Sequence, residues 1–136
     1  MSWEGPLAPP KVTPENQHFW TGGARGELVF LHCAKCDYYI HPPTPRCPIC
    51  FSNNVSPRAV SGLAEVHSFT VNHQAWVPEL VVPYVIAEVA IEEQPSLRLT
   101  TNIVGCAPEE VAIGMPVRVM FERRGAAWLP MFTPRA

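Results

Sequence analysis

The chain has 136 residues, which is enough for one ordinary domain or for a small domain with a metal-stapled appendage. Hydrophobic residues make up 47% of it, which excludes wholesale disorder, and charged residues make up only 16%, which favours a surface partly covered by a partner. The formal net charge is -2 and the lysines are Lys11 and Lys35 alone, which argues against the basic patch of a nucleic-acid binder.

The sequence shows no signal for a membrane or for secretion. No stretch approaches the roughly 18 consecutive apolar residues of a membrane helix. The N-terminus also lacks the basic region and the following apolar run of a secretory signal peptide. We therefore expect a cytoplasmic protein, in which cysteine thiols stay reduced.

The first predicted element is a short helix that follows a loose, proline-rich tail over residues 1–12. Thr13 is expected to be its N-cap, and Gly22-Gly23 is expected to end it. A helix of about ten residues is marginal alone in water, so we expect it to dock on something. It carries Phe19 and Trp20, which are our candidates for contact with a partner.

Four cysteines in two close pairs give the strongest chemical signal of the sequence. The pattern is Cys-x-x-Cys, a loop of ten residues and a second Cys-x-x-Cys, formed by Cys33, Cys36, Cys47 and Cys50. Each pair can supply two thiolates from one tight turn, which is typical of a tetrahedral zinc site. A zinc ion with four thiolates has no open coordination position, so we expect it to be structural and not catalytic.

Other interpretations of this region stay open at the level of sequence. The four cysteines are also compatible with two disulfides or with buried free thiols, and His32 or His41 can in principle replace one of them as a ligand. Cys106 stands apart and is interpreted as a small buried hydrophobic residue. Glu27–His32 is expected to be a short strand before the first pair, and residues 52–57 a polar joint after the second.

From Ser61 onward the pattern predicts β-structure. Apolar and polar residues alternate with a period of two, which is typical of half-buried strands. Five strands are expected, with a helical turn near residues 107–111 between the third and the fourth: residues 63–71, 84–91, 97–104, 115–123 and 126–132. The inward-facing side chains are expected to include Leu97, Leu99, Ile103, Val117, Val119 and Phe121. Five short strands with one such turn suit a small closed barrel of the OB-fold type.

The connection over residues 72–83 is long and apolar for so compact a domain. Two interpretations stay open: it packs against a ligand or another protein, or it folds back over the barrel mouth and completes the core. Its candidate contact residues are His73, Trp76 and Pro78. We find no group of residues in the sequence that is typical of an active site, such as a nucleophile with its base or a glycine-rich phosphate loop.

These elements divide the chain into three parts. We expect a tail with a docking helix over residues 1–26, a zinc ribbon over residues 27–57 and an OB-fold domain over residues 58–136. The predicted fold class is therefore mainly β, with a short N-terminal helix, a rubredoxin-like zinc ribbon and a C-terminal five-stranded barrel.

The order of these motifs resembles a known family. Phe19-Trp20, the cysteine ribbon with its Arg46-Cys47-Pro48 run, and Gly62 at the start of the barrel are similar to the zinc-ribbon plus OB-fold proteins. That family is catalogued as domain of unknown function thirty-five and later as acyl-CoA-associated proteins. The barrel segments at residues 83–87 and 113–119 are similar as well, and the resemblance spans roughly residues 13–132.

One local feature departs from this resemblance. Glycine commonly follows each cysteine pair in such ribbons, because the tight turn needs a positive φ. Asp37 and Phe51 stand at these places here. Asp tolerates that conformation moderately well and Phe does not, so we expect the second turn to be shaped differently.

The resemblance implies a function. Members of the family are small partner subunits of thiolase-like enzymes, which carry out acyl transfer or retro-aldol cleavage on coenzyme A thioesters, including those of lipid or steroid side chains. Others serve hot-dog-fold enoyl-CoA hydratases. The catalytic residues belong to the partner, so we expect a non-catalytic accessory subunit with one structural zinc. The rival hypotheses are a single-stranded nucleic-acid-binding zinc-ribbon protein and a free-standing enzyme.

Overall fold

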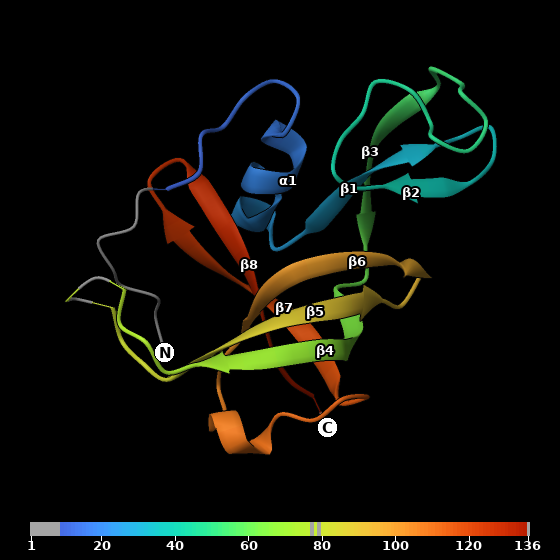
Figure 1. Cartoon of the computed structure of the whole chain (residues 1–136). Coiled ribbons are helices and arrows are strands. Elements are labelled where there is room, and N and C mark those ends of the chain that lie inside the picture. The colour runs from blue at the N-terminus through green and yellow to red at the C-terminus, as the bar shows by residue number, and fades with distance from the viewer. Residues whose placement is uncertain (1–8, 77, 79, 136) are drawn as a thin grey trace.

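The computed structural model describes residues 9–76, 78 and 80–135. Its strands are β1 (Leu28–Cys33), β2 (Tyr38–Ile40), β3 (Val55–Val60), β4 (Leu63–Asn72), β5 (Tyr84–Ile91), β6 (Gln94–Ile103), β7 (Pro116–Arg124) and β8 (Ala127–Pro134). The first three form a small antiparallel sheet in the order β2-β1-β3, and the other five form a closed barrel in the order β4-β5-β6-β8-β7 (Figure 1). The barrel closes through a parallel pairing of β6 with β8, at Ile103 and Phe132.

The barrel strands form where the sequence alternates between apolar and polar residues. In β5 every second residue is buried, so that Val85, Ala87, Val89 and Ile91 all face the core. The predicted inward-facing residues of β6 and β7 behave in the same way: Leu97, Leu99, Ile103 and Val117 are buried, and Val119 and Phe121 pack against the same cluster. The five-stranded barrel of the OB-fold type is therefore confirmed, as is the helical turn between its third and fourth strands, which is a 3-10 turn, η2, at Pro108–Glu110.

The N-terminal helix begins later than predicted. The helix α1 spans Gln17–Thr21, and residues 13–16 form a turn before it. Within that turn Thr13 N–H donates a hydrogen bond of 2.7 Å to the side chain of Asn16, and Asn16 N–H donates one of 3.2 Å to the carbonyl of Thr13. Thr13 is therefore not the N-cap, because the chain closes a separate turn around it.

The helix ends where predicted, with Gly22 as its C-cap, but the chain does not reverse there. Gly22 and Gly23 lie in a 3-10 turn, η1, over Gly22–Arg25, and the chain reverses at Gly26, which has the left-handed conformation with φ of 71°. Gly23 is needed because there is no room for a side chain: a Cβ built on it would lie 2.6 Å from the ring of Phe121. It allows close packing on the barrel rather than a chain reversal.

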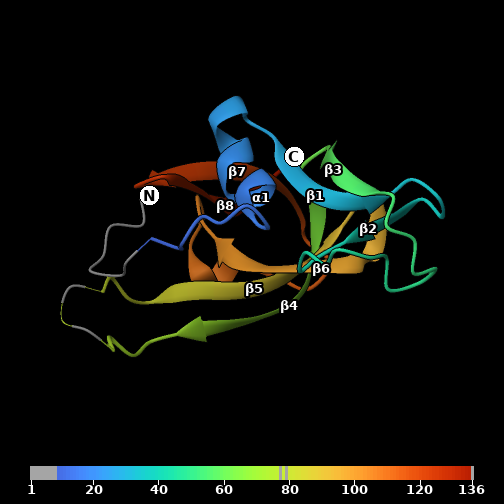
Figure 2. The same ribbon diagram turned by 90° about the horizontal axis from the view of Figure 1, so that it is seen from above.

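The helix docks as expected, but it docks on its own chain. It contacts both β1 and β8 and lies where the small sheet meets the barrel (Figures 1 and 2). Phe19 is only 3% exposed and belongs to the main buried cluster, where its ring is 5.9 Å from that of Phe30. No helix among the described residues is long and apolar enough to cross a bilayer.

The passage from the small sheet to the barrel is a strand and not a polar joint. β3 pairs with β1 over its whole length, from Leu28 opposite Val60 to Cys33 opposite Val55. Two residues later β4 begins, after Gly62 with φ of 84°. A Cβ on Gly62 would lie 2.5 Å from Cγ1 of Val119, so both the conformation and the close approach require glycine.

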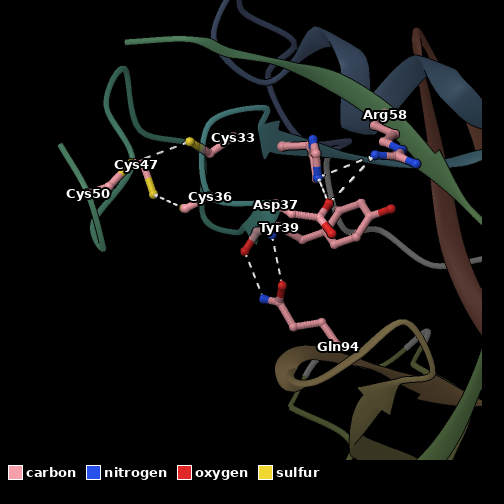
Figure 3. Close-up of polar contacts among 9 residues, drawn as sticks. Cys33, Cys36, Asp37, Tyr39, Cys47, Cys50, Arg58 and Gln94 are labelled. Atoms are coloured by element: carbon pink, nitrogen blue, oxygen red, sulfur yellow. Dashed lines mark hydrogen bonds and ion pairs between the residues drawn. The ribbon is translucent and has the colours of Figure 1, made fainter. Parts of the chain in front are cut away.

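A side chain ties the small sheet to the barrel a second time. Gln94, at the start of β6, accepts a hydrogen bond of 2.8 Å from the N–H of Tyr39 and donates one of 2.9 Å to the carbonyl of the same residue (Figure 3). The amide of Gln94 thus makes the two hydrogen bonds that a neighbouring strand would offer to β2. This contact and the β3–β4 connection fix the orientation of the sheet on the barrel.

Candidate metal centre and docking surfaces

The four cysteines of the two pairs lie together at the end of the small sheet (Figure 3). All four sulfurs lie within 4.8 Å of one another, with 3.6 Å between the Sγ atoms of Cys33 and Cys50 and 3.4 Å between those of Cys36 and Cys47. A tetrahedral zinc with Zn–S bonds of about 2.3 Å requires sulfurs about 3.8 Å apart. The donor set and its spacing therefore fit a zinc ion with four thiolate ligands.

The residue that follows each cysteine pair has a positive φ. Asp37 follows the first pair with φ of 56° and Phe51 follows the second with φ of 62°. The expectation of a different second turn is wrong, because the hydrogen bonds from Phe51 N–H to the Cys47 carbonyl and from Cys47 N–H to the Ser52 carbonyl, both 2.9 Å, hold the turn tight. For a residue other than glycine this conformation costs roughly 1–2 kcal/mol.

The electrostatics of the thiols favour a bound cation. The N–H of Cys36 lowers the pKa of Cys33. Although desolvation by burial opposes them, the N–H groups of Cys50 and Ile49 bring the pKa of Cys47 down to about 7. Desolvation and the neighbouring thiols raise the pKa of Cys36 to about 12. A divalent cation resolves this conflict, since it deprotonates the thiols that coordinate it.

The two histidines near the cysteines have other partners. His32 is buried, and its Nε2 lies 2.6 Å from Oδ1 of Asp37, which in turn lies 3.8 Å from Nη1 of Arg58. His41 packs against the ring of Phe19 at 4.7 Å, and desolvation and the nearby His18 lower its pKa to about 4. Neither histidine belongs to the cluster of metal-ligating groups found among the described residues.

Two grooves flank the helix α1. One, of about 740 Å³, lies between α1 and the outer face of the small sheet, with Val29, Leu31 and Val55 in its wall. The other, of about 650 Å³, lies between α1 and strands β6 and β8 and is lined by Trp20 and Arg98, among others. Trp20 is half-buried with its ring edge-on to Phe19, at 4.8 Å. Of the two predicted contact residues, Trp20 is partly accessible in this groove, whereas Phe19 belongs to the core.

The long β4–β5 connection leaves the barrel at the end opposite to the cysteine turns (Figures 1 and 2). Trp76 is 74% exposed, and His73 and Pro78 are exposed as well. Leu80 is buried, so part of the loop does fold back on the barrel. Part of the loop therefore follows the second interpretation, whereas contact with a ligand or another protein stays a prediction. Residues 77 and 79 lie outside the described residues.

The remaining candidates have ordinary surroundings. Cys106 is half-buried and packs against the main cluster, and desolvation, followed by the nearby Glu110, raises its pKa. His67 is exposed at an irregularity in the β4–β5 pairing. In the part of the chain that the structure describes, the four cysteines are the only group of three or more residues placed to hold a metal.

Sequence models of one family match most of the chain. The rubredoxin-like zinc ribbon domain of ChsH2 matches residues 20–56, and its C-terminal OB-fold domain matches residues 57–122. The chain belongs to the ChsH2 family. A chain of the solved structure named "Ltp2-ChsH2(DUF35) aldolase" has a TM-score of 0.82 and 35% identity, with coverage of 93% of this chain and 98% of that chain.

Curated relatives of this ChsH2-family chain carry two kinds of name. A "DUF35 domain-containing scaffold protein" of Methanocaldococcus jannaschii is 36% identical over 71% of this chain and 68% of its own length. The "3-oxo-4,17-pregnadiene-20-carboxyl-CoA hydratase alpha subunit" of Mycobacterium tuberculosis is 36% identical over 82% of this chain and 35% of its own length. The chain spans 35–39% of the length of the curated hydratase subunits that it matches.

Two polar groups that shape this ChsH2-family chain were not among the predicted site residues. One is the contact of Gln94 with Tyr39, for which an alternating pattern carries no signal, because the partner lies 55 positions away. The other is the group formed by His32, Asp37 and Arg58 beside the first cysteine turn. The sequence feature that points to this group is Asp37 at a position where glycine is usual. There the hydrogen bond of the Asp side chain offsets the strain of a positive φ.

Proposed function

We propose that the chain is the non-catalytic accessory subunit of an acyl-CoA-processing complex. Its partner is a thiolase-like enzyme that makes or cleaves carbon–carbon bonds on coenzyme A thioesters, including those of the lipid or steroid side-chain type. The observation that carries the proposal is the match to the ChsH2 chain of an aldolase structure, at 35% identity over 98% of that chain. A match of this extent includes both the zinc ribbon and the OB-fold domain of this chain.

The site itself supports a role through a partner rather than through its own chemistry. Four thiolates fill the coordination sphere of the zinc, so this metal, one per chain, holds structure and offers no position to a substrate. Large apolar side chains instead lie at the surface, with Trp76 at 74% exposure. Such residues are typical of protein or ligand contacts.

We assign the contacts as follows. Trp20 and the groove beside α1 contact the partner, and the loop with His73, Trp76 and Pro78 lies near the partner's acyl-CoA entrance. We propose the division into a docking segment (1–26), a zinc ribbon (27–57) and an OB-fold domain (58–136), and a cytoplasmic setting in which the thiols remain available for zinc.

A second candidate is a subunit of a hot-dog-fold enoyl-CoA hydratase. It is favoured by the 36% identity to the M. tuberculosis hydratase alpha subunit, of which the chain spans 35%. We rank the aldolase-type partner first, because the match covers 98% of the chain in the aldolase structure and 93% of this chain. In the hydratase relative the remaining length has no counterpart in this chain.

Co-purification with the two classes of partner tests the proposal. The tagged chain is expressed with a thiolase-like subunit or with a hydratase subunit, and the complexes are separated by size-exclusion chromatography and assayed on acyl-CoA substrates. We expect a stable complex with the thiolase-like subunit, activity of the complex and no turnover by this chain alone. Trp20→Ala is expected to weaken the complex by about 2 kcal/mol, roughly thirtyfold in Kd. Turnover by the isolated chain overturns the subunit role, and a complex with the hydratase alone selects the second candidate.

A further inference from the structure

The second cysteine turn presents two large apolar side chains to solvent. Ile49 is 60% exposed and Phe51 is 72% exposed, on either side of Cys50. The turn lies at the edge of the molecule, away from the barrel, in both views (Figures 1 and 2). Neither residue belongs to a buried cluster of the described chain.

Phe51 is an unexpected residue for its backbone conformation. Its φ of 62° is one that glycine adopts freely and other residues adopt under strain. At the equivalent position of the first turn, Asp37 offsets that strain through its contact with His32 at 2.6 Å. The Phe51 ring has no such role in the fold, because the contact that Arg46 makes with this residue, at 3.1 Å, is to its backbone carbonyl. The fold therefore does not account for the ring.

Two exposed cations flank this turn. Four thiolates around a divalent ion carry a formal charge of -2, which together with Asp37 offsets the three cations between Cys33 and Arg58, namely Lys35, Arg46 and Arg58, so the segment as a whole is neutral and only local charges matter. Lys35 and Arg46 are both exposed, and neither is in an ion pair within the described part of the chain. A partner surface complementary to this turn is therefore apolar at its centre and acidic around it.

We propose that Ile49 and Phe51 form an anchor that inserts into an apolar pocket with an acidic rim on the partner enzyme subunit. The inference rests on the proposed function and adds to it a second contact, separate from Trp20. The zinc ligands on both sides of Ile49 and just before Phe51 hold the anchor rigid, so little freedom is lost when it binds. An exposed aromatic residue on a rigid support is typical of the residues that dominate protein interfaces.

The substitution Phe51→Gly separates a binding role from a structural one. Glycine removes the ring and also relieves the strain, so the zinc content should stay unchanged and the Tm of the free chain should stay equal or rise. The Kd for the thiolase-like subunit, measured by titration calorimetry, should increase at least tenfold. Ile49→Ser should act in the same direction, and Lys35→Glu should weaken binding most at low salt.

Ile113→Ser is the matched control. Ile113 is 71% exposed in the turn before β7, on the barrel, and its removal should leave the Kd unchanged.

If the wild-type chain does not bind the thiolase-like subunit, the proposed function fails and the anchor fails with it. If the wild type binds and Phe51→Gly binds equally well, the anchor alone is refuted. A fall in the Tm of Phe51→Gly refutes the claim that the ring has no part in the fold. Loss of self-association or of single-stranded nucleic-acid binding in Phe51→Gly, with the Kd for the enzyme unchanged, assigns the turn to a different occupant and overturns the proposal.

Discussion

The cysteine end of the small sheet depends on its cysteines, because the residues expected to bind the metal also form most of the buried cluster there. The buried cluster there consists of Cys33, Ile40 and Cys47, so two of its three members are metal ligands. The barrel and the helix have a separate and larger cluster, which also includes Leu28, Phe30 and Tyr39 from the barrel side of the small sheet. Zinc is therefore expected to stabilise the ribbon turns strongly and the barrel only indirectly.

Cys36→Ser should remove the zinc and unfold the ribbon turns while the barrel stays folded. Zinc binding contributes about 10–16 kcal/mol to the folding of comparable peptides, far more than a cluster of this size can supply. Metal analysis should find less than one zinc per ten chains. Hydrogen exchange should become fast in β2 while β5 stays protected. Full zinc content in this variant would contradict the assignment of the four ligands.

His41 should make the fold sensitive to acid. Burial, followed by the nearby His18, lowers the pKa of His41 to about 4, against about 6.5 in the unfolded chain. Between these two values the unfolded state binds more protons, so the stability is fully present above pH 6.5 and decreases as the pH falls toward 4. The Tm should therefore be clearly lower at pH 5 than at pH 7.5, and His41→Phe should reduce that difference. An unchanged pH dependence in His41→Phe would show that another group is responsible.

At the scale of elements, the alternation of buried and exposed residues within β7 offers a direct test of register. Val117 is fully buried and its neighbour Arg118 is exposed on the opposite face. Val117→Asp places an unpaired charge in the core and should destabilise the protein by about 3–5 kcal/mol. Arg118→Asp, the matched control, should change the free energy of unfolding by less than about 1 kcal/mol. Urea denaturation of both variants measures the difference, and similar values would mean that the register is wrong.

Alternation is also the reason why the barrel could be predicted from the sequence. A period of two places β5 at Tyr84–Ile91, as the sequence predicts, because one face of the strand is buried and the other is not. β3 could not be found in this way. Its central residues are exposed on both faces, so no alternation marks it, and its pairing with β1 is specified by the cysteine turns between them. β2 has only three residues, which is too short for any period.

The cluster of four cysteines was predictable for a different reason, whereas the start of the helix was not. The spacing of the four cysteines predicts a metal site whatever the surrounding fold, and the structure brings the same four side chains together. The helix ends depend on what touches them: Asn16 closes a turn before α1, and Gly23 packs on Phe121. Phe19 looked available for a partner because its own tertiary neighbour, Phe30, cannot be identified from a pattern.

At the scale of the whole molecule, Trp76 and Trp20 should have different effects when truncated. Trp76 lies on the loop at the far end of the barrel, whereas Trp20 belongs to α1 and lines the groove between that helix and strands β6 and β8. In the proposed complex Trp76→Ala should leave the Kd for the thiolase-like subunit within about twofold and raise the KM for long acyl-CoA substrates several-fold. Steady-state kinetics of the purified complex tests this. A Trp76→Ala variant that fails to assemble would place the loop in the main interface instead.

The direct connection of β3 to β4 also limits how far the small sheet can move relative to the barrel. Only Ser61 and Gly62 separate the two strands, and the amide of Gln94 holds the sheet to the barrel at a second point. β3 is about 20 Å long at 3.3 Å per residue. Its pairing with β1 over the whole of this length keeps it extended. The second cysteine turn and the barrel are therefore held in one relative orientation. A partner that presents complementary surfaces to the two in another orientation can bind one of them but not both, so we expect partner selection to depend on geometry as well as on surface chemistry.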